Sequence, residues 1–407
     1  MKKKSLIYLF FALMVTVLIV VAINAAIKRK ICPYLLLKNY QQVATNPPAL
    51  LNTQDLSGNF GSSQNLDFGS IVNLSNVKLT KSIILNGFKF QRGKVNVKDL
   101  GKTGAADLRG EKIWFINQDN YYLLNALGLD KKIFSNGGIK TLFSLGQRNF
   151  VYVAYVDNGC ASARVVDLNS KEVVLQLECL PNPEKVDLNG SGGAWLKLSD
   201  SEGLLSTGTP TMAHVNDEIN QIAQSNRSLW GKILKLSLVN NKLTVETFSK
   251  GHRNPQGLAK IANNIFDVEH GPMGGDEINI IKRGKNYGWP LQSLGTEYDL
   301  GIINKSYSKP IKTEASLLSF VPSIGLSYIE KCPQVFSNYY APNDCLAVSS
   351  MSGMAIDLVV HRDGKLLFSE KMQFDSRIRR FFVQGNTIVA VTDFQGIIIG
   401  NFTQIYL

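Results

Sequence analysis

The sequence lacks the concentrated basic stripe, interleaved with aromatic side chains, by which many proteins bind nucleic acid. Its 407 residues carry a formal net charge of +12, but six of the positive charges lie within the first thirty residues, which contain no acid. The remaining lysines and arginines are scattered among acids, in a chain that is 44% hydrophobic and 19% charged. We therefore expect neither nucleic-acid binding nor intrinsic disorder, and the composition suffices for a large packed core.

Charged residues are also absent from the apolar segment Ser5–Ile27. At about 1.5 Å per residue, a helix of this length crosses a hydrocarbon core of about 30 Å. The residues that follow offer a poor signal-peptidase site, which favours an uncleaved anchor. We expect an N-terminal membrane anchor or signal segment at residues 1–30, a linker at 31–70 and a folded domain at 71–407.

Cysteine is sparse, with five in the chain, but four of them group into two candidate pairs. Cys160 and Cys179 flank two strand-like runs, and a two-residue turn midway between them would place them opposite each other. Cys332 and Cys345 flank a short loop. Spacing leaves separate buried thiols open as the alternative. Two disulfides would favour an oxidising compartment, so we expect a membrane-anchored protein whose folded part lies on the periplasmic or extracellular side.

The chain has no long amphipathic helix and no strict blade repeat such as a recurring Trp-Asp dipeptide. From about residue 71 it shows short β-type runs separated by turn residues, such as NFVYVAYV, GKILKLSLVNNKLTVETF and DLVVHRDGKLLFSE. Many short strands at near-regular spacing favour a β-propeller over a sandwich. The number of blades does not follow from periodicity.

One stretch, Gly251–Pro290, is rich in glycine, proline and charge: GHRNPQGLAKIANNIFDVEHGPMGGDEINIIKRGKNYGWP. Gly271-Pro272 and Gly274-Gly275 allow backbone carbonyls to point into a cavity, where a hard cation such as Ca²⁺ binds such oxygens. Arg253 and Asn254 offer hydrogen bonds to a carboxylated or quinone ligand. The alternative is a purely structural loop whose acidic pair ties down neighbouring backbone.

The segments GHRNPQGLA, EHGPMGGDEIN and GKNYGWP resemble the signature of the soluble glucose/sorbosone dehydrogenase family, the aldose sugar dehydrogenases that depend on pyrroloquinoline quinone (PQQ). Weaker similarity extends over residues 138–402. The resemblance implies a six-bladed β-propeller that oxidises the C1 hydroxyl of a sugar to a lactone, passes a hydride to PQQ and uses Ca²⁺ to polarise the quinone. Together with the apolar segment, the expected fold is an all-β six-bladed β-propeller with an N-terminal transmembrane helix.

The resemblance also assigns roles to individual residues. It places at cofactor-contacting positions Arg253, Asn254, Arg377 and Arg379, and at the calcium position the carbonyls of Gly271 and Pro272. For the two arginines near the C-terminus the alternative is a solvated pair on one strand face, since residues two apart in a strand point the same way.

Three polar residues of the family pattern are replaced. Gly190 stands where the family has its histidine base, Thr209 where a carboxylate orients that base, and Ser352 where a lysine binds the cofactor. Among the four histidines, His214 is a weak substitute for the base, and His361 is predicted to be exposed in a hairpin turn. The sequence therefore leaves three readings open: a sugar dehydrogenase with a rearranged base, a catalytically lapsed propeller that binds a ligand or protein at the cell envelope, and a purely structural propeller.

Overall fold

The computed structural model describes residues 70–405, apart from gaps at 86, 98–99, 110, 130–136, 181–184, 211–217, 299–302 and 304–311. The anchor predicted for residues 1–30 and nearly all of the predicted linker lie outside the described residues. None of the described helices has the length and hydropathy needed to span a membrane.

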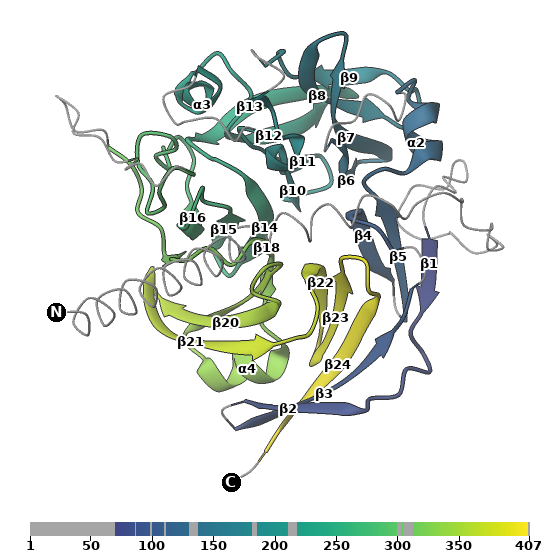
Figure 1. Cartoon of the computed structure of the whole chain (residues 1–407), viewed down its shortest axis with the longest axis vertical. Coiled ribbons are helices and arrows are strands. Elements are labelled where there is room, and N and C mark those ends of the chain that lie inside the picture. Colours follow the sequence, from purple (N-terminus) through teal and green to yellow (C-terminus); the bar gives the residue numbers. More distant parts are fainter. Residues whose placement is uncertain are drawn as a thin grey trace, which may run out of the picture. The chain divides into compact units, whose positions relative to one another are not determined.

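The described strands form six antiparallel sheets, or blades, arranged around a central axis (Figure 1). The innermost strands of neighbouring blades contact one another around the ring. The prediction of an all-β, six-bladed propeller is therefore confirmed. The first three blades contain, in order, β1 (Ser70–Asn73), β5 (Lys112–Asn117) and β4 (Thr103–Arg109); β6 (Gly138–Leu145), β7 (Arg148–Asp157), β8 (Cys160–Asp167) and β9 (Val173–Gln176); and β10 (Gly192–Lys197), β11 (Glu202–Thr207), β12 (Lys232–Val239) and β13 (Lys242–Lys250).

The fourth and fifth blades have the same up-and-down order, and the sixth combines strands from the early and late parts of the described chain. Their strands are β14 (Pro255–Ile261), β15 (Asn264–Glu269), β16 (Asp276–Ile281) and β17 (Leu318–Phe320); β18 (Leu326–Lys331), β19 (Asp344–Ser350), β20 (Ala355–Arg362) and β21 (Lys365–Gln373); and β2 (Lys81–Leu85), β3 (Phe88–Val95), β24 (Ile397–Gln404), β23 (Thr387–Thr392) and β22 (Ile378–Gln384).

The ring closes where β3 pairs antiparallel with β24, from Phe88 opposite Gln404 to Val95 opposite Ile397. Gly400 lies in this seam, and a Cβ atom there would come within 2.2 Å of the Phe90 ring. Early and late segments of the chain therefore share one sheet, and glycine allows their close approach.

Each of the six innermost strands carries a β-bulge near its start, where one extra residue interrupts the pairing with the next strand. A bulge breaks the strand's alternation and re-aims a side chain. Around the ring, the bulge residues are Gly104, Lys140, Gly193 with Ala194, Gln256, Ser327 and Arg379. Six equivalent positions are thereby turned toward the axis.

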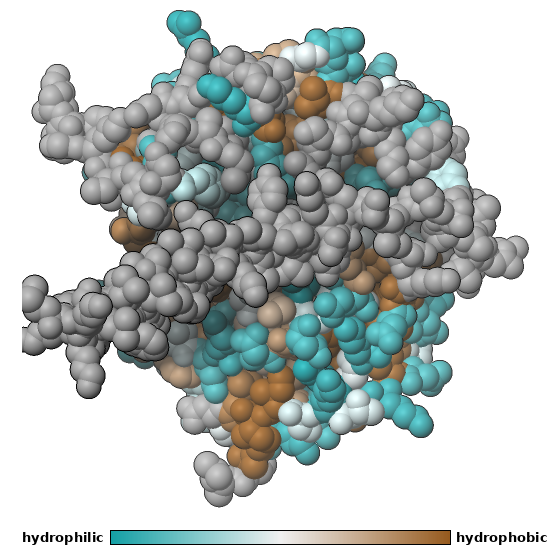
Figure 2. Space-filling model, viewed as in Figure 1, coloured by the Kyte–Doolittle hydropathy of each residue, from teal (hydrophilic) through white to brown (hydrophobic). Residues whose placement is uncertain are grey.

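Apolar clusters between neighbouring blades form the core. Between the second and third blades, the rings of Phe143 and Trp195 stack with centroids 4.0 Å apart. The outermost strands are more exposed, and β21 is exposed at most of its positions. Among the coloured residues of the lower part of the view, hydrophilic side chains surround a hydrophobic patch near the lower edge (Figure 2). This polar-out, apolar-between arrangement is typical of radially packed sheets.

Short helices connect or cover the blades: α2 (Tyr121–Ala126), η4 (Leu188–Gly190), α3 (Glu218–Gln221), η5 (Ile222–Gln224) and α4 (Gln334–Tyr340). The α2 helix begins where the Asn120 side chain accepts the backbone N–H of Leu123 at 3.0 Å, an ordinary N-cap. In α4, Phe336 packs against Phe88 and Phe402, and so covers the closing seam.

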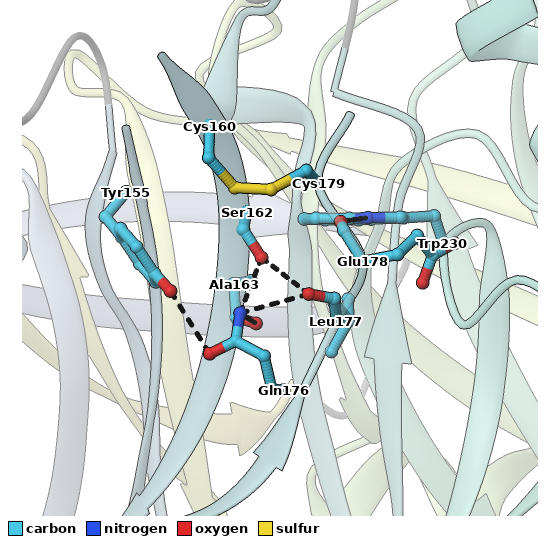
Figure 3. Close-up of a disulfide and its surroundings, with 9 residues drawn as sticks. All are labelled: Tyr155, Cys160, Ser162, Ala163, Gln176, Leu177, Glu178, Cys179 and Trp230. Carbon is cyan, nitrogen blue, oxygen red and sulfur yellow. Dashed lines mark hydrogen bonds between the residues drawn. A yellow bond between two sulfur atoms is a disulfide. The ribbon is translucent and has the colours of Figure 1, made fainter. Parts of the chain in front are cut away.

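Both candidate cysteine pairs form disulfides, Cys160–Cys179 and Cys332–Cys345, with Cα atoms 5.2 and 5.4 Å apart. The predicted two-residue turn is wrong: β8 and β9 are separated by Leu168–Glu172, and a bulge shifts their register. The bond still forms because the chain beyond β9 stays beside β8 (Figure 3). It is held there by hydrogen bonds from the Trp230 indole to the Glu178 carbonyl and from the Ser162 hydroxyl to the Leu177 carbonyl.

Candidate functional site

A cavity of about 250 Å³ lies where the six innermost strands converge. All six blades contribute to its wall, and at every blade the bulge contributes a lining residue. From β4 to β22 these are Gly104, Lys140, Gly193, Gln256, Ser327 and Arg379. A polar cavity formed by one equivalent position of each blade is the default ligand site of such a fold.

The cavity wall is strongly basic. Five basic side chains line it, and no aspartate or glutamate does so among the described residues: the basic residues are Lys102, Lys140, Arg377, Arg379 and Arg380. Low-dielectric walls of one charge sign concentrate ligands of the opposite sign. The cavity is therefore suited to an anionic ligand.

Lys140 is buried, with 6% of its surface exposed, and its amine makes no hydrogen bond or ion pair with another described residue. Burial, followed by repulsion from Arg379, lowers the pKa of Lys140 to about 7. Burial and Arg379 also lower the pKa of the neighbouring Lys102. Near neutral pH the protonated and neutral forms of the Lys140 amine therefore coexist.

Arg379 is held in place by a buried carboxylate. Its guanidinium donates two hydrogen bonds to Asp393, at 3.0 and 2.7 Å, in a bidentate pair. Arg377 lies 3.7 Å from the same carboxylate and remains half exposed. The two arginines therefore share one negative charge, and their side chains retain positive charge for a ligand, since both line the cavity.

The signature stretch is divided between cavity and scaffold. Asn254, which the resemblance placed at a cofactor position, lines the cavity, and so does His270, to which no role was assigned, whereas Arg253 does not. The Arg253 guanidinium instead donates to the carbonyl of Gly271 at 2.7 Å and to the hydroxyl of Tyr298 at 2.9 Å. Neither Gly271 nor Pro272 is among the lining residues.

His270 is the one histidine among the lining residues, but both of its ring nitrogens are engaged. Its Nε2 bonds the Leu326 carbonyl, and its Nδ1 lies 3.5 Å from the Asn254 amide nitrogen. Burial lowers the pKa of His270, so the neutral ring is favoured. A ring nitrogen that donates to a carbonyl leaves the other nitrogen as an acceptor, which here faces Asn254.

The replaced family positions have structural roles. The η4 turn ends at Gly190, where a Cβ atom would lie 3.0 Å from Pro210 Cα. The buried Thr209 donates through its hydroxyl to the Arg253 carbonyl at 3.3 Å. Ser352 is exposed in a turn and does not line the cavity. The weak substitute His214 lies outside the described residues.

A second group of ionisable side chains lies inside the fourth blade, away from the cavity wall. His252, Asp267 and Glu269 are all buried, and one potential metal-ligand atom of each lies within 4.8 Å of the others. Burial, followed by the nearby Glu269, raises the pKa of Asp267 well above its ordinary value and favours its protonated form. Protonation of Asp267 can therefore offset negative charge in this cluster without a bound metal ion.

Sequence reasoning missed part of the site and misplaced one histidine. The lysines at 102 and 140 carry no motif, and the one signal for Lys140 is its position at the start of a strand after the turn residues Asn136-Gly137. His361 is buried in β20 rather than exposed in a turn, so that prediction is wrong. A histidine within an alternating β run is better interpreted as an inward-facing residue.

The cavity where the six innermost strands converge is called the hub cavity. A six-bladed propeller whose hub cavity is basic, and therefore suited to an anionic ligand, is the class of protein that the fold and the site define. A sequence model of the Glucose / Sorbosone dehydrogenase family matches residues 138–399, which is well over half of the chain. The chain therefore belongs to the glucose/sorbosone dehydrogenase family.

Characterised relatives match over shorter segments. The chain is 56% identical over 55 residues to the aldose sugar dehydrogenase YliI of Escherichia coli, which is 13% of this chain and 15% of that protein. It is 36% identical over 110 residues to the quinoprotein glucose dehydrogenase B of Acinetobacter calcoaceticus, which is 25% of this chain and 22% of that protein. The matched segments thus span less than a quarter of either relative.

Solved structures resemble the chain over most of its length. The soluble aldose sugar dehydrogenase of Escherichia coli, in its apo form, superposes with a TM-score of 0.58 at 20% identity and covers 77% of this chain and 99% of its own. The PQQ-bound aldose sugar dehydrogenase of Streptomyces coelicolor gives a TM-score of 0.50 at 16% identity and covers 82% and 98%. At these identities the likeness supports the fold.

Proposed function

We propose that the chain is a PQQ-dependent aldose dehydrogenase that oxidises the C1 hydroxyl of a sugar to a lactone. The observation that carries the proposal is the basic hub cavity, which combines several cations with an absence of lining carboxylates among the described residues. PQQ bears carboxylates and a quinone, and it supplies a hydride acceptor when bound. Membership of the family also supports an anionic occupant.

The residues present fit such a cofactor. Arg377 and Arg379 would bind its carboxylates, and Asp393 would keep Arg379 oriented while they do so. The amides of Asn254 and Gln256 line the same wall, and the Gln256 amide donates to the Asn254 side-chain oxygen at 2.6 Å. This amide pair would orient a quinone or a sugar hydroxyl by hydrogen bonding.

The residues predicted to bind calcium fit less well. The Gly271 carbonyl accepts a hydrogen bond from the Arg253 guanidinium, so a positive group already occupies the position of a cation there. Calcium needs six to eight oxygen ligands, and the two backbone carbonyls would supply a minority of them. Calcium at Gly271 and Pro272 stays a prediction, and no catalytic step is derived from it.

Titration of the purified full-length chain with PQQ tests the proposal. We expect saturable binding, seen as a cofactor absorbance band, and reduction of an artificial dye with at least one aldose. Arg377→Met should weaken PQQ binding about 10- to 100-fold, because a hydrogen bond to a charged group contributes about 1.5–3 kcal/mol. Arg362→Met, on the exposed end of β20, is the matched control and should bind as wild type.

Absence of PQQ binding by the wild-type chain would overturn the proposal. Tight binding without dye reduction would instead favour a second candidate, an envelope propeller that binds a ligand or protein without turnover. Gly190 and Thr209, which replace the family's base and its carboxylate partner, are the observation that favours this candidate. For either function, the two disulfides support our proposal that the folded part lies outside the cytoplasm, attached to the membrane through residues 5–27.

A further inference from the structure

The loss of the family's histidine leaves the proposed reaction without an obvious proton acceptor, and the hub cavity offers one. Lys140 lies at the bulge of β6, where it is the extra residue between the paired positions Ile139 and Thr141. It is buried, lines the cavity and has no partner among the described residues. A side chain that is held inward by a bulge and yet bonded to nothing is suited to act on a ligand.

Lys232 provides an internal comparison, because it is equally buried and its pKa is also lowered to about 7. The Lys232 amine, however, donates to three backbone carbonyls, those of Ile222, Ala223 and Trp230, at 3.1, 3.0 and 2.6 Å. Lys232 is thus a satisfied structural lysine. The difference between the two lysines lies in their contacts, which leave the Lys140 amine free to react.

Space for Lys140 is provided by the neighbouring blade. A Cβ atom at Gly193 would approach Lys140 Cβ to 2.7 Å, and Gly193 has a φ of +114°, a conformation that favours glycine. The glycine pair that follows the replaced histidine position therefore adjoins Lys140 directly. The base of the Lys140 side chain therefore lies beside Gly193, three residues after Gly190, and comes from the adjacent blade.

We propose that Lys140 is the general base of the sugar oxidation, in place of the histidine that the family has at position 190. This inference rests on the proposed function. Lys140 Nζ would accept the proton of the sugar hydroxyl as the O–H bond breaks and the C=O double bond forms. Bound PQQ would supply the acceptor for the hydride that leaves C1 with the electron pair of the C1–H bond, and the ammonium of Lys140 would then release its proton to solvent.

The groups around Lys140 control its protonation. Lys102 and Arg379 favour the neutral amine by repulsion, and Asp187 favours the ammonium. The carboxylates of a bound cofactor would also favour the ammonium form of Lys140, whereas the positive charges of Arg377 and Arg379 would oppose that effect. Dye reduction at low sugar concentration should therefore rise with pH through about 7 or somewhat above, where the amine loses its proton.

The decisive variants are Lys140→Arg and Lys140→Ala, made in the full-length chain; both should lose activity. Arginine keeps the positive charge but cannot accept a proton near neutral pH. Lys140→Arg should bind PQQ within about tenfold of wild type and lose about 10²- to 10⁴-fold in kcat. Lys140→Ala should regain part of this loss on addition of methylamine. Lys260→Met, exposed on β14, is the matched control and should leave kcat unchanged.

A labelling experiment gives a readout that does not depend on turnover. Pyridoxal 5′-phosphate forms an imine with an unprotonated amine, and borohydride traps it for peptide mapping. At pH 7 we expect labelling at Lys140, none at the enclosed Lys232, and protection of Lys140 by PQQ.

The outcomes separate the two proposals. Wild-type turnover that Lys140→Arg retains would overturn the base assignment while the dehydrogenase function stands. An unlabelled Lys140 would overturn the assignment as well, because its amine would be inaccessible or protonated. If the wild-type chain oxidises no aldose although PQQ binds, the dehydrogenase proposal and the base assignment fail together, whatever the labelling shows.

Discussion

At the scale of single residues, the fourth blade brings carboxyl side chains of neighbouring strands close together. Glu269 on β15 and Glu277 on β16 are directly opposite each other, an unfavourable arrangement for two like charges. Burial, followed by Glu269, raises the pKa of Glu277 to about 8. The folded state therefore binds a proton at Glu277 more tightly than the unfolded state does, whose glutamate pKa is about 4.3.

This difference predicts a pH-dependent stability. A raised folded-state pKa stabilises the fold below the unfolded pKa, and that contribution is lost as pH rises through about 8. The Tm of the wild-type chain should thus fall between pH 5 and pH 9. Glu277→Gln, which removes this titration, should match wild type at pH 5 and exceed its Tm by a few degrees at pH 9, as measured by calorimetry.

Glu246→Gln is the control for this experiment. Glu246 is exposed on β13 and pairs with Arg283 at the surface, so its change should not flatten the pH profile. Identical pH profiles for Glu277→Gln and wild type would contradict the prediction and show that Glu277 is ionised in the folded protein at neutral pH.

The sequence predicted individual site residues only where a motif marked them. Asn254 and the arginines at 377 and 379 were assigned through the family pattern, and all three line the cavity. Lys140 was missed because a bulge turns it inward, and neither alternation nor composition signals a one-residue insertion in a strand. Arg253 was placed in the site by analogy, but its guanidinium is drawn to the Gly271 carbonyl instead.

At the scale of elements, the Cys160–Cys179 bond fastens the start of β8 to the chain beyond β9 (Figure 3). The edge strand β9 has four residues, two of them exposed, so packing alone stabilises this side of the second blade weakly. A cross-link over 19 residues constrains the unfolded chain by about 3 kcal/mol in the loop-entropy account.

Replacing both cysteines, as Cys160→Ser with Cys179→Ser, should lower the free energy of unfolding by about 2–4 kcal/mol and the Tm by several degrees. Denaturant unfolding followed by tryptophan fluorescence measures the change, since Trp230 lies beside the bond. Reduction by dithiothreitol should destabilise wild type more than this double variant, which keeps the second disulfide. Equal sensitivity of both proteins to dithiothreitol would contradict the assignment.

Sequence reasoning located this element but not its register. Cysteine spacing and β-type runs predicted both the strands and the bond correctly. The turn was wrong because Asp167 accepts the backbone N–H groups of Asn169 and Ser170, at 2.7 and 3.2 Å, and so stabilises a longer loop. Local side-chain hydrogen bonds of this kind compete with the shortest hairpin turn.

At the scale of the whole molecule, the propeller depends on one seam. The sixth blade has five strands because β2 and β3 join β22–β24. The number of blades was foreseen from the family resemblance and not from strand spacing. The closing strands were not foreseen, because they precede the region of similarity and long-range pairing leaves no local signal.

Gly400→Ala should weaken this seam. The added methyl group would clash with the buried Phe90 ring and lie 2.9 Å from the Gln91 carbonyl oxygen, both on β3. Overpacking of this kind costs about 1–3 kcal/mol, which denaturant unfolding can measure. Gly101→Ala is the control, since its Cβ would meet only the Asn117 amide at an ordinary 3.5 Å. Equal stability of the two variants would mean that β3 and β24 can move apart at Gly400 without loss of stability.

The repeated bulge has a consequence for how such a protein changes its chemistry. One bulge position of each of the six sheets faces the same axis, and four of these positions carry a side chain: Lys140, Gln256, Ser327 and Arg379. When a reactive side chain beside the cavity is lost from one blade, a single substitution in the next blade can supply another, without any change to the surrounding sheets. On the proposed base assignment, Lys140 in the second blade would take over the role of the residue replaced by Gly190, which lies just before β10 of the third blade.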